Sequence, residues 1–348
     1  MLLSVFGTPS AFTYAGCAIV RAIADTAAGS HAFIQAVFLD DVRNAWASLD
    51  RSRTKAVVLF SDFPATPLIE LVRSARSPTV VFLDDFEEVA HQAIETRDMP
   101  VAHALRFASQ VFCALDQLSQ ERVLLVTSKA CGRPVGDLVS AASEFFGLAE
   151  SAALGERVLA RLGYEASRGV TLGEHFAGTR PRVVSDQAAA VRDDPHDQSL
   201  IKQVGSQYVG VGTGQGRADI CWPTELFLEW DRPGAFLNGP IDLLGPARFI
   251  ICGPYLHLPA GDWVANVVIE ISENLSGNRL GVDVFSGTIL RGVTMNLPET
   301  GVFEFSIPFQ VEDPFLPVEL RFQILTGAIE GKLMLQRVTF QRSMSRTD

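Results

Sequence analysis

The segment MLLSVFGTPSAFTYAGCAIV (residues 1–20) joins a short apolar run, a Gly-Thr-Pro-Ser turn and an amphipathic stretch. Residues 2–6 are apolar enough for a buried strand, and residues 15–28 repeat apolar side chains at helical spacing. A strand that passes through a tight turn directly into a helix is typical of a βαβ unit. The segment therefore predicts an α/β domain that begins with a strand–loop–helix junction.

The same alternation of strand and helix continues through the first half of the chain. Further strands are predicted at residues 33–39, 56–60, 79–83 and 122–127, and helices at residues 42–48, 67–75, 101–118, 135–146, 149–163 and 169–176. Strands that are apolar on both faces form parallel sheets covered by helices on both sides. We therefore predict a parallel-sheet α/β domain over residues 1–177.

The second half of the chain has a different periodicity. Residues 178–204 are polar and lack a sustained apolar period, which predicts a linker. In runs such as residues 263–272 and 318–324, apolar residues then recur at every second position. This period is typical of half-buried antiparallel strands, and turn sequences separate the runs. We predict an all-β sandwich, or jelly roll, over residues 205–348.

Composition limits the partners and the location of the protein. The 348 residues carry a net charge of −11, whereas a nucleic-acid partner normally requires a basic surface. No run reaches the roughly 18 apolar residues that a membrane span needs. The 5 cysteines are odd in number and lack Cys-x-x-Cys spacing. We therefore expect free thiols, no metal site, no nucleic-acid partner, no membrane span and a cytoplasmic location.

Several segments of the predicted α/β domain resemble the sulfotransferase family, whose fold is of the P-loop α/β type. The Gly7-Thr8 turn is similar to the family's loop for the 5′-phosphosulfate group. Further similar segments are residues 78–90 (PTVVFLDDFEEVA), 122–127, 136–139 (GDLV) and 144–148 (EFFGL), which match the fourth strand, the fifth strand and the helix that follows it. The resemblance covers residues 1–165 and lies in the order and spacing of these segments.

The resemblance implies a nucleotide of the adenosine 3′,5′-bisphosphate type, bound at Gly7, Thr8 and Ser10. A loop between a strand and a helix presents backbone N–H groups and the positive end of the helix dipole, both of which suit a phosphate. The Arg and Ser with which the family holds the 3′-phosphate correspond here to Asp84 and Gln92. A carboxylate repels a phosphate, so we predict a degenerate donor site.

Asp84 and Asp85 are the candidate catalytic residues. With Glu87 and Glu88 they follow a predicted strand, where α/β folds place ligands, and could hold Mg²⁺ or act as a general base. Alternatively, acidic residues at the start of a helix only stabilise the helix dipole. Both interpretations stay open, and the sequence does not decide whether the protein is an enzyme.

The predicted sandwich carries aromatic residues interspersed with acidic ones. The candidate ligand-binding residues are Trp222, Trp230, Tyr255 and His257 at a rim, and Glu319 and Arg321 on a sheet face. Sugars stack on aromatic rings and donate hydrogen bonds to carboxylates and amides. With its GPYLHLPAGDW (residues 253–263) and VELR (residues 318–321) segments, this domain resembles carbohydrate-binding jelly rolls found beside bacterial glycan-modifying domains. The alternative is that the aromatic residues fill the core.

Three functions remain open from the sequence. The first is a non-catalytic or weakly catalytic glycan-binding or assembly protein in bacterial-type polysaccharide or glycoconjugate metabolism. The second is a sulfotransferase-like group transferase that acts on a carbohydrate. The third is a structural module that forms a homo-oligomer through sandwich faces or edges. The missing phosphate-binding cations and the aromatic-rich sandwich favour the first.

Overall fold

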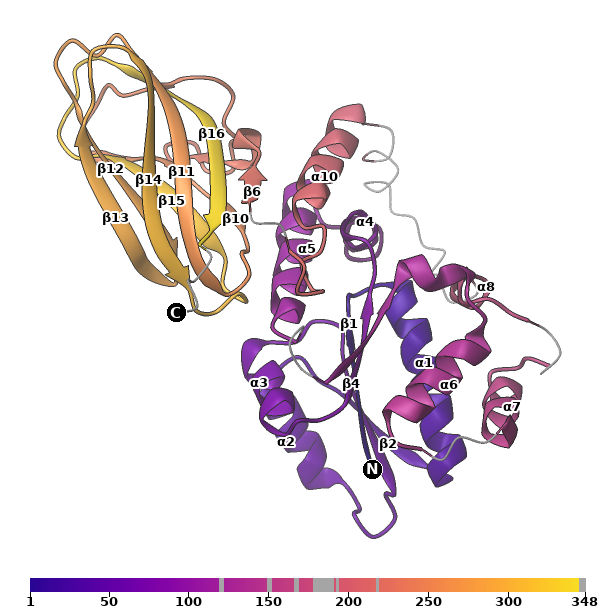
Figure 1. The fold of residues 1–348 in the computed structure, drawn as a ribbon. Coiled ribbons are helices and arrows are strands. Elements are labelled where there is room, and N and C mark those ends of the chain that lie inside the picture. The colour runs from indigo at the N-terminus through magenta and orange to yellow at the C-terminus, as the bar shows by residue number, and fades with distance from the viewer. Residues whose placement is uncertain are drawn as a thin grey trace. The chain divides into compact units, whose positions relative to one another are not determined.

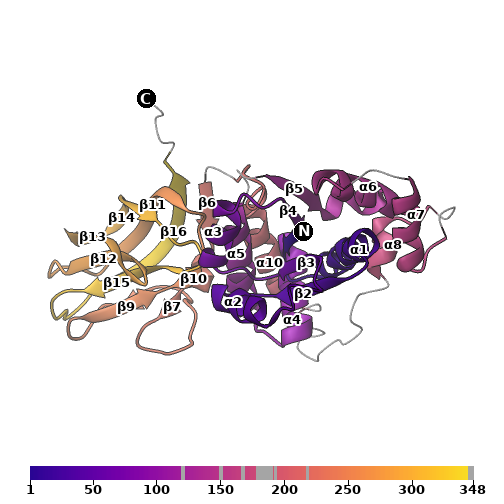
Figure 2. The same ribbon diagram turned by 90° about the horizontal axis from the view of Figure 1, so that it is seen from below.

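The computed structural model describes residues 1–118, 122–148, 152–165, 169–177, 191, 194–216 and 219–343. Packing divides the chain into two compact units. The first comprises Met1–Pro100, Ala114–Ala190 and Gly212–Gly214, and the second comprises Val101–Cys113, Val191–Val211 and Gln215–Asp348. Figures 1 and 2 label the elements of both units. Every helix among the described residues is too short or too polar to span a lipid bilayer.

The first unit is built on a five-stranded parallel sheet, which confirms the predicted α/β class. Its strand order is β2-β3-β1-β4-β5. The strands are β1 (Leu2–Gly7), β2 (His31–Gln35), β3 (Ala56–Ser61), β4 (Thr79–Leu83) and β5 (Val123–Thr127). The helices are α1 (Ala11–Ala28), α2 (Leu39–Ser48), α3 (Thr66–Ser74), α4 (Phe86–Arg97), α6 (Val135–Phe145), α7 (Ala152–Arg161) and α8 (Leu172–Ala177). Helices α1 and α6–α8 lie on one face of the sheet, and α2 and α3 lie on the other (Figure 1).

Close packing fixes the junction between β1 and α1. Ser10 caps α1, because its hydroxyl accepts a hydrogen bond from the Thr13 N–H. Gly7 and Gly16 lie against β4 with no room for a side chain: a Cβ at Gly7 would lie 2.5 Å from the Phe82 carbonyl oxygen, and one at Gly16 would lie 2.3 Å from the Phe82 ring. The first loop is therefore pressed directly onto the carboxyl end of β4.

The second unit contains two antiparallel sheets, which confirms the predicted β-sandwich class. One sheet has the order β13-β12-β15-β9-β7, with β10 paired to β15, and the other has the order β14-β11-β16-β6, with β8 paired to β16. The strands are β6 (Asp219–Trp222), β7 (Leu228–Glu229), β8 (Ile241–Asp242), β9 (Arg248–Cys252), β10 (Pro254–Leu256), β11 (Gly261–Ser272), β12 (Arg279–Ser286), β13 (Thr288–Asn296), β14 (Gly301–Val311), β15 (Val318–Ile324) and β16 (Lys332–Arg342). Inward-facing residues of both sheets form its core.

The structure divides the chain differently from the predicted boundaries. Residues 178–190 and 192–193 of the predicted linker lie outside the described residues, but helix α10 (Pro195–Gln207) occupies its end. Asp194 caps this helix and Pro195 is its first residue, a start signal that the sequence interpretation missed. Most of helix α5 (Val101–Asp116) also belongs to the second unit. The side chains of Ser109 and Gln110 bond to residues of the sandwich, His257 and Phe315.

Candidate functional site

The outward face of the sheet β13-β12-β15-β9-β7 brings together the most promising of the predicted residues. Side chains alternate along β15, so Val318, Leu320 and Phe322 are fully buried whereas Glu319 and Arg321 point away from the core. The register places Arg321 opposite Asp283 and Glu319 opposite Phe285, both on β12. Cross-strand pairs of this kind share a face, so these four side chains form one continuous surface.

Arg321 is held rigidly on this outward face. Its Nε donates a hydrogen bond to Oδ1 of Asp283 at 2.8 Å. The guanidinium carbon lies 4.1 Å from the ring centroid of Phe285 and 5.3 Å from that of Phe249 on β9. A cation between two aromatic rings has a fixed orientation. Among the described residues, the side-chain hydrogen bond of Arg321 to Asp283 uses Nε, so its Nη N–H groups can donate to a ligand oxygen.

Trp230 extends this surface with an exposed aromatic ring. It follows β7 directly, its side chain is 45% exposed, and its ring centroid lies 4.8 Å from that of Phe249. The backbone N–H of Trp230 donates to the Ile250 carbonyl at 3.0 Å, which ties this residue to β9. Phe249 therefore links Trp230 on one side to Arg321 on the other. We call the row Trp230, Phe249, Arg321 and Phe285 the aromatic–arginine row.

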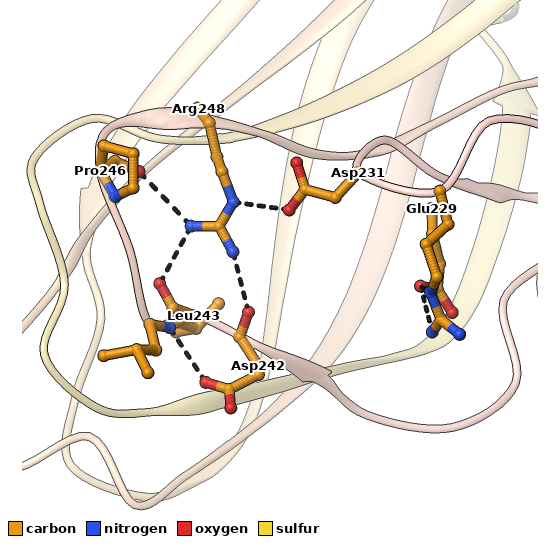
Figure 3. A network of polar contacts seen from close by, with 8 residues as sticks. Glu229, Asp231, Asp242, Leu243, Pro246 and Arg248 are labelled. Atoms are coloured by element: carbon orange, nitrogen blue, oxygen red, sulfur yellow. Dashed lines mark hydrogen bonds and ion pairs between the residues drawn. The ribbon is translucent and has the colours of Figure 1, made fainter.

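Arg248 fastens the loop that follows Trp230 (Figure 3). Its Nε donates to Oδ2 of Asp231 at 2.7 Å. Its other nitrogens donate to the carbonyl oxygens of Leu243 at 3.2 Å, Pro246 at 3.4 Å and Asp242 at 3.2 Å. The residue next to Trp230 is thereby tied to the turn before β9. Glu229 on the other side of Trp230 pairs with Arg232. Arg248 therefore positions the tryptophan and has its own donors occupied.

Tyr255 lies on β10, which pairs with the start of β15 at Val318 and Glu319. Its φ of 68° is in the left-handed region, which a bulky residue adopts only when its surroundings hold it there. Arg106 of α5 supplies that hold, because its Nε donates to the Pro254 carbonyl at 2.7 Å and its guanidinium lies 5.0 Å from the Tyr255 ring centroid. The Tyr255 hydroxyl donates to Sγ of Cys252 at 3.6 Å, and burial raises the pKa of both Tyr255 and the neighbouring Glu319.

Trp222 and His257 require a correction, because neither lies at a rim. The Trp222 side chain is 1% exposed and packs against Phe340, with the ring centroids 4.1 Å apart. His257 is 4% exposed, and its Nδ1 lies 3.2 Å from the Ser109 hydroxyl. Burial lowers the pKa of His257 to about 3, so its imidazole is neutral at physiological pH. Both side chains fill the interior of the second unit, and we remove them from the candidate site.

The sequence analysis missed Phe249, Asp283 and Phe285. The alternation in RLGVDVFS (residues 279–286) would have placed Asp283 and Phe285 on one face. Their meeting with Arg321 depends on β12 pairing with β15, two strands that are far apart in the sequence. Local pattern alone therefore identified some of the outward residues but not the row that they form.

The loop after β1 has its backbone donors occupied by the protein itself. Thr8 and Ser10 are fully buried. The N–H of Thr8 donates to the Phe82 carbonyl at 3.0 Å, and that of Ser10 donates to the Thr8 carbonyl at 2.7 Å. The Ala11 N–H donates to Oε1 of Gln92 at 3.0 Å. A phosphate at Gly7, Thr8 and Ser10 would have to displace these partners.

Asp84 lies directly against this loop. Its N–H donates to the Thr8 hydroxyl at 3.1 Å, and its Oδ1 accepts a hydrogen bond from the Asp85 N–H at 2.9 Å. Burial raises the pKa of the Asp84 carboxyl, while the neighbouring Asp85 occupies the N-cap position of α4. The loop after β1 thus binds the backbone of Asp84, and a half-buried carboxylate lies beside it. Within the described ranges, no three His, Cys, Asp or Glu side chains are placed to hold a metal ion.

Comparisons with known proteins add structural similarities only. No protein-family model matches the chain, and no curated protein matches its sequence. The chain is similar to a mouse sulfotransferase complexed with PAP, at 9% identity and a TM-score of 0.38 over 60% of this chain and 85% of that one. It is also similar to the xylan-binding module CBM15, at 12% identity and a TM-score of 0.27 over 37% of this chain and 99% of that one. A third similar structure is the carboxyl-terminal CBM6 of LamC, a laminarinase of Zobellia galactanivorans, at 12% identity and a TM-score of 0.20 over 29% of this chain and 76% of that one.

Proposed function

We propose that the second unit binds polysaccharide chains on the outward face of the sheet β13-β12-β15-β9-β7. The observation that carries the proposal is the aromatic–arginine row, in which the exposed Trp230 ring continues through Phe249 to an immobilised Arg321. A sugar ring buries its C–H face on an aromatic ring and turns its hydroxyls to polar groups at the edge. The row provides both kinds of contact side by side.

The polar residues of this face suit hydroxyl groups. Asp283 and Glu319 accept hydrogen bonds, whereas Arg321 only donates them. Asp283 and Arg321 already fix each other through a hydrogen bond, so little of their side-chain entropy is lost when a ligand binds. An extended surface of this kind favours a chain of several sugar units over a single small molecule.

The first unit supports the non-catalytic form of this proposal. The donors of the loop after β1 bond to Gln92 and to backbone carbonyls, and Asp84 supplies a carboxylate where a nucleotide would bring a phosphate. The proposal is therefore a glycan-binding protein of polysaccharide or glycoconjugate metabolism, and transfer of a sulfuryl group is not part of it.

Affinity electrophoresis and calorimetric titration of the full chain test the proposal, with xylan, a β-1,3-glucan and their oligosaccharides as ligands. Trp230→Ala should weaken binding about thirtyfold, because removing a central aromatic anchor commonly costs about 2 kcal/mol. Trp46→Ala is the matched control, since Trp46 is 42% exposed but belongs to the first unit. Equal losses in the two variants, or no binding across the panel, would contradict the proposal.

A further inference from the structure

The first unit contains an apolar cavity that no part of the proposed glycan site uses. It has a volume of about 550 Å³ and lies between α2, α3 and the face of the sheet that these helices cover. Ile34, Val57 and Leu59 line it from the sheet, and Val42, Trp46 and Leu71 line it from the helical side. The volume is within the range of about 300–1,000 Å³ that is typical of small-molecule sites.

Helix α2 leaves this cavity open because it does not pack closely against the sheet. None of its residues is buried, whereas α1 buries ten on the opposite face. The start of α2 is nevertheless fixed, since Oδ2 of Asp41 accepts hydrogen bonds from the N–H groups of Val37 at 2.9 Å and Phe38 at 2.8 Å. A helix that is anchored at its start and lifted along its length leaves apolar side chains without neighbours. A ligand with an apolar body would supply the missing contacts.

The polar groups of the cavity indicate the chemistry of that ligand. Arg43, Arg51 and Ser77 are the polar side chains that line it, and none of the lining residues is acidic. Two cations at an apolar cavity are notable in a chain with a net charge of −11. Nη1 of Arg43 bonds to Oδ1 of Asp40 at 2.9 Å, and the Arg51 guanidinium lies 5.8 Å from the Trp46 ring centroid. Arg51 is therefore placed to meet an anionic head group while the Trp46 ring packs on an apolar chain.

We infer that this cavity binds an amphiphilic anion, a carboxylate with an unbranched acyl chain. The acyl chain lies among the apolar residues between α2, α3 and the sheet, and the carboxylate pairs with Arg51. Binding would then strengthen about fourfold for each buried methylene, until the chain fills the cavity. This site is independent of the glycan-binding face.

Calorimetric titration of the full chain with octanoate, decanoate and dodecanoate, each below its micelle concentration, tests the inference. We expect one site per chain and about a fifteenfold gain in affinity for each two methylenes added. Arg51→Gln should weaken binding of dodecanoate at least fivefold, whereas Arg53→Gln should leave it unchanged. Arg53 is the matched control, because it is exposed, pairs with Asp50 and does not line the cavity.

Filling the cavity separates specific binding from adsorption. Ala47→Trp places a large ring at a lining position of α2 and should abolish binding, with far-UV circular dichroism showing that the fold persists. Ala47→Leu, a smaller change that preserves helix propensity, should weaken binding and serves if the tryptophan variant fails to fold. Dodecanoate binding that survives both changes would overturn the inference. A light-scattering mass of two chains that falls to one in Ala47→Trp would also overturn it, because a second copy would then cover the cavity.

Discussion

The loop after β1 and the outward face of β15 both carry residues that the sequence singles out, yet their surroundings are opposite. Thr8 and Ser10 are fully buried, and the donors around them bond to other groups of the protein. Trp230 and Arg321 are held just as firmly, but Trp230 is 45% exposed and the bond from Arg321 to Asp283 uses only Nε. The protein's own contacts fix the side chains of both regions, but of the two only the outward face of β15 offers groups to a ligand. A binding surface here therefore differs from a closed loop in the atoms that the surrounding residues leave accessible.

The tightness of the first loop gives the largest expected effect. In Gly7→Ala the new Cβ would lie 2.5 Å from the Phe82 carbonyl oxygen and 2.6 Å from the Thr13 side chain, and a backbone atom has little room to retreat. We expect a loss of about 3 kcal/mol in the free energy of unfolding. Chemical denaturation should show it, while Gly132→Ala, whose Cβ would have nothing within 4 Å, should change stability little. Similar stabilities for the two variants would mean that the loop after β1 is not packed tightly against β4.

Removing the Arg321 cation from the outward face of β15 should have the next largest effect. Arg321→Met retains a chain that can pack between Phe249 and Phe285 but leaves Asp283 without its charged partner. We expect a loss of about 2 kcal/mol in stability and weaker glycan binding, because hydrogen bonds to charged groups contribute about 1.5–3 kcal/mol. Arg337→Met is the control: Arg337 pairs with Glu304 on the other sheet and both are exposed, so its loss should cost under about 1 kcal/mol.

The Asp84 carboxylate, which follows β4 and lies against the first loop, predicts that stability depends on pH. Burial raises the pKa of Asp84 above its ordinary value, so the folded state binds the proton more tightly than the unfolded state does. The stability that this proton contributes is present at acid pH, below the ordinary pKa of Asp, and is lost as the pH rises through the raised pKa. Asp84→Asn should therefore gain about 1 kcal/mol at pH 7 and flatten the dependence of stability on pH.

Denaturation at several pH values measures this effect. Asp85→Asn removes the same charge one residue away, at the N-cap position of α4, and is the matched control for the change in net charge. A curve for Asp84→Asn that runs parallel to the wild-type curve would show that the Asp84 carboxyl does not titrate abnormally.

The sequence predicted the features that depend on neighbouring residues, and it did not predict those that depend on pairing between distant strands. The alternation of strands with helices and the period of two predicted both sheet types, because each depends on neighbouring residues. Trp222 and Trp230 have similar acidic neighbours, so only pairing could separate them: Trp222 lies opposite Val338 and points into the core, whereas Trp230 follows the edge strand β7. Phe249, Asp283 and Arg321 come from three strands, and no spacing within one strand predicts that they meet.

The substitution with the smallest expected effect tests how far the glycan-binding face extends beyond the aromatic–arginine row. Ile289 on β13 lies opposite Phe285, so its side chain continues the aromatic–arginine row to the edge of the sheet, and it is 61% exposed. Ile289→Ser should change the free energy of unfolding by less than about 0.5 kcal/mol, as exposed substitutions usually do. If a glycan chain crosses β13, calorimetric titration should nevertheless show weaker binding by a few-fold, because the ligand loses an apolar contact. Val302→Ser is the control, since Val302 is 64% exposed on β14, a strand of the other sheet. Unchanged binding in both variants would confine the site to β12, β15, β9 and the residue after β7, where Arg321 and Trp230 already account for its contacts.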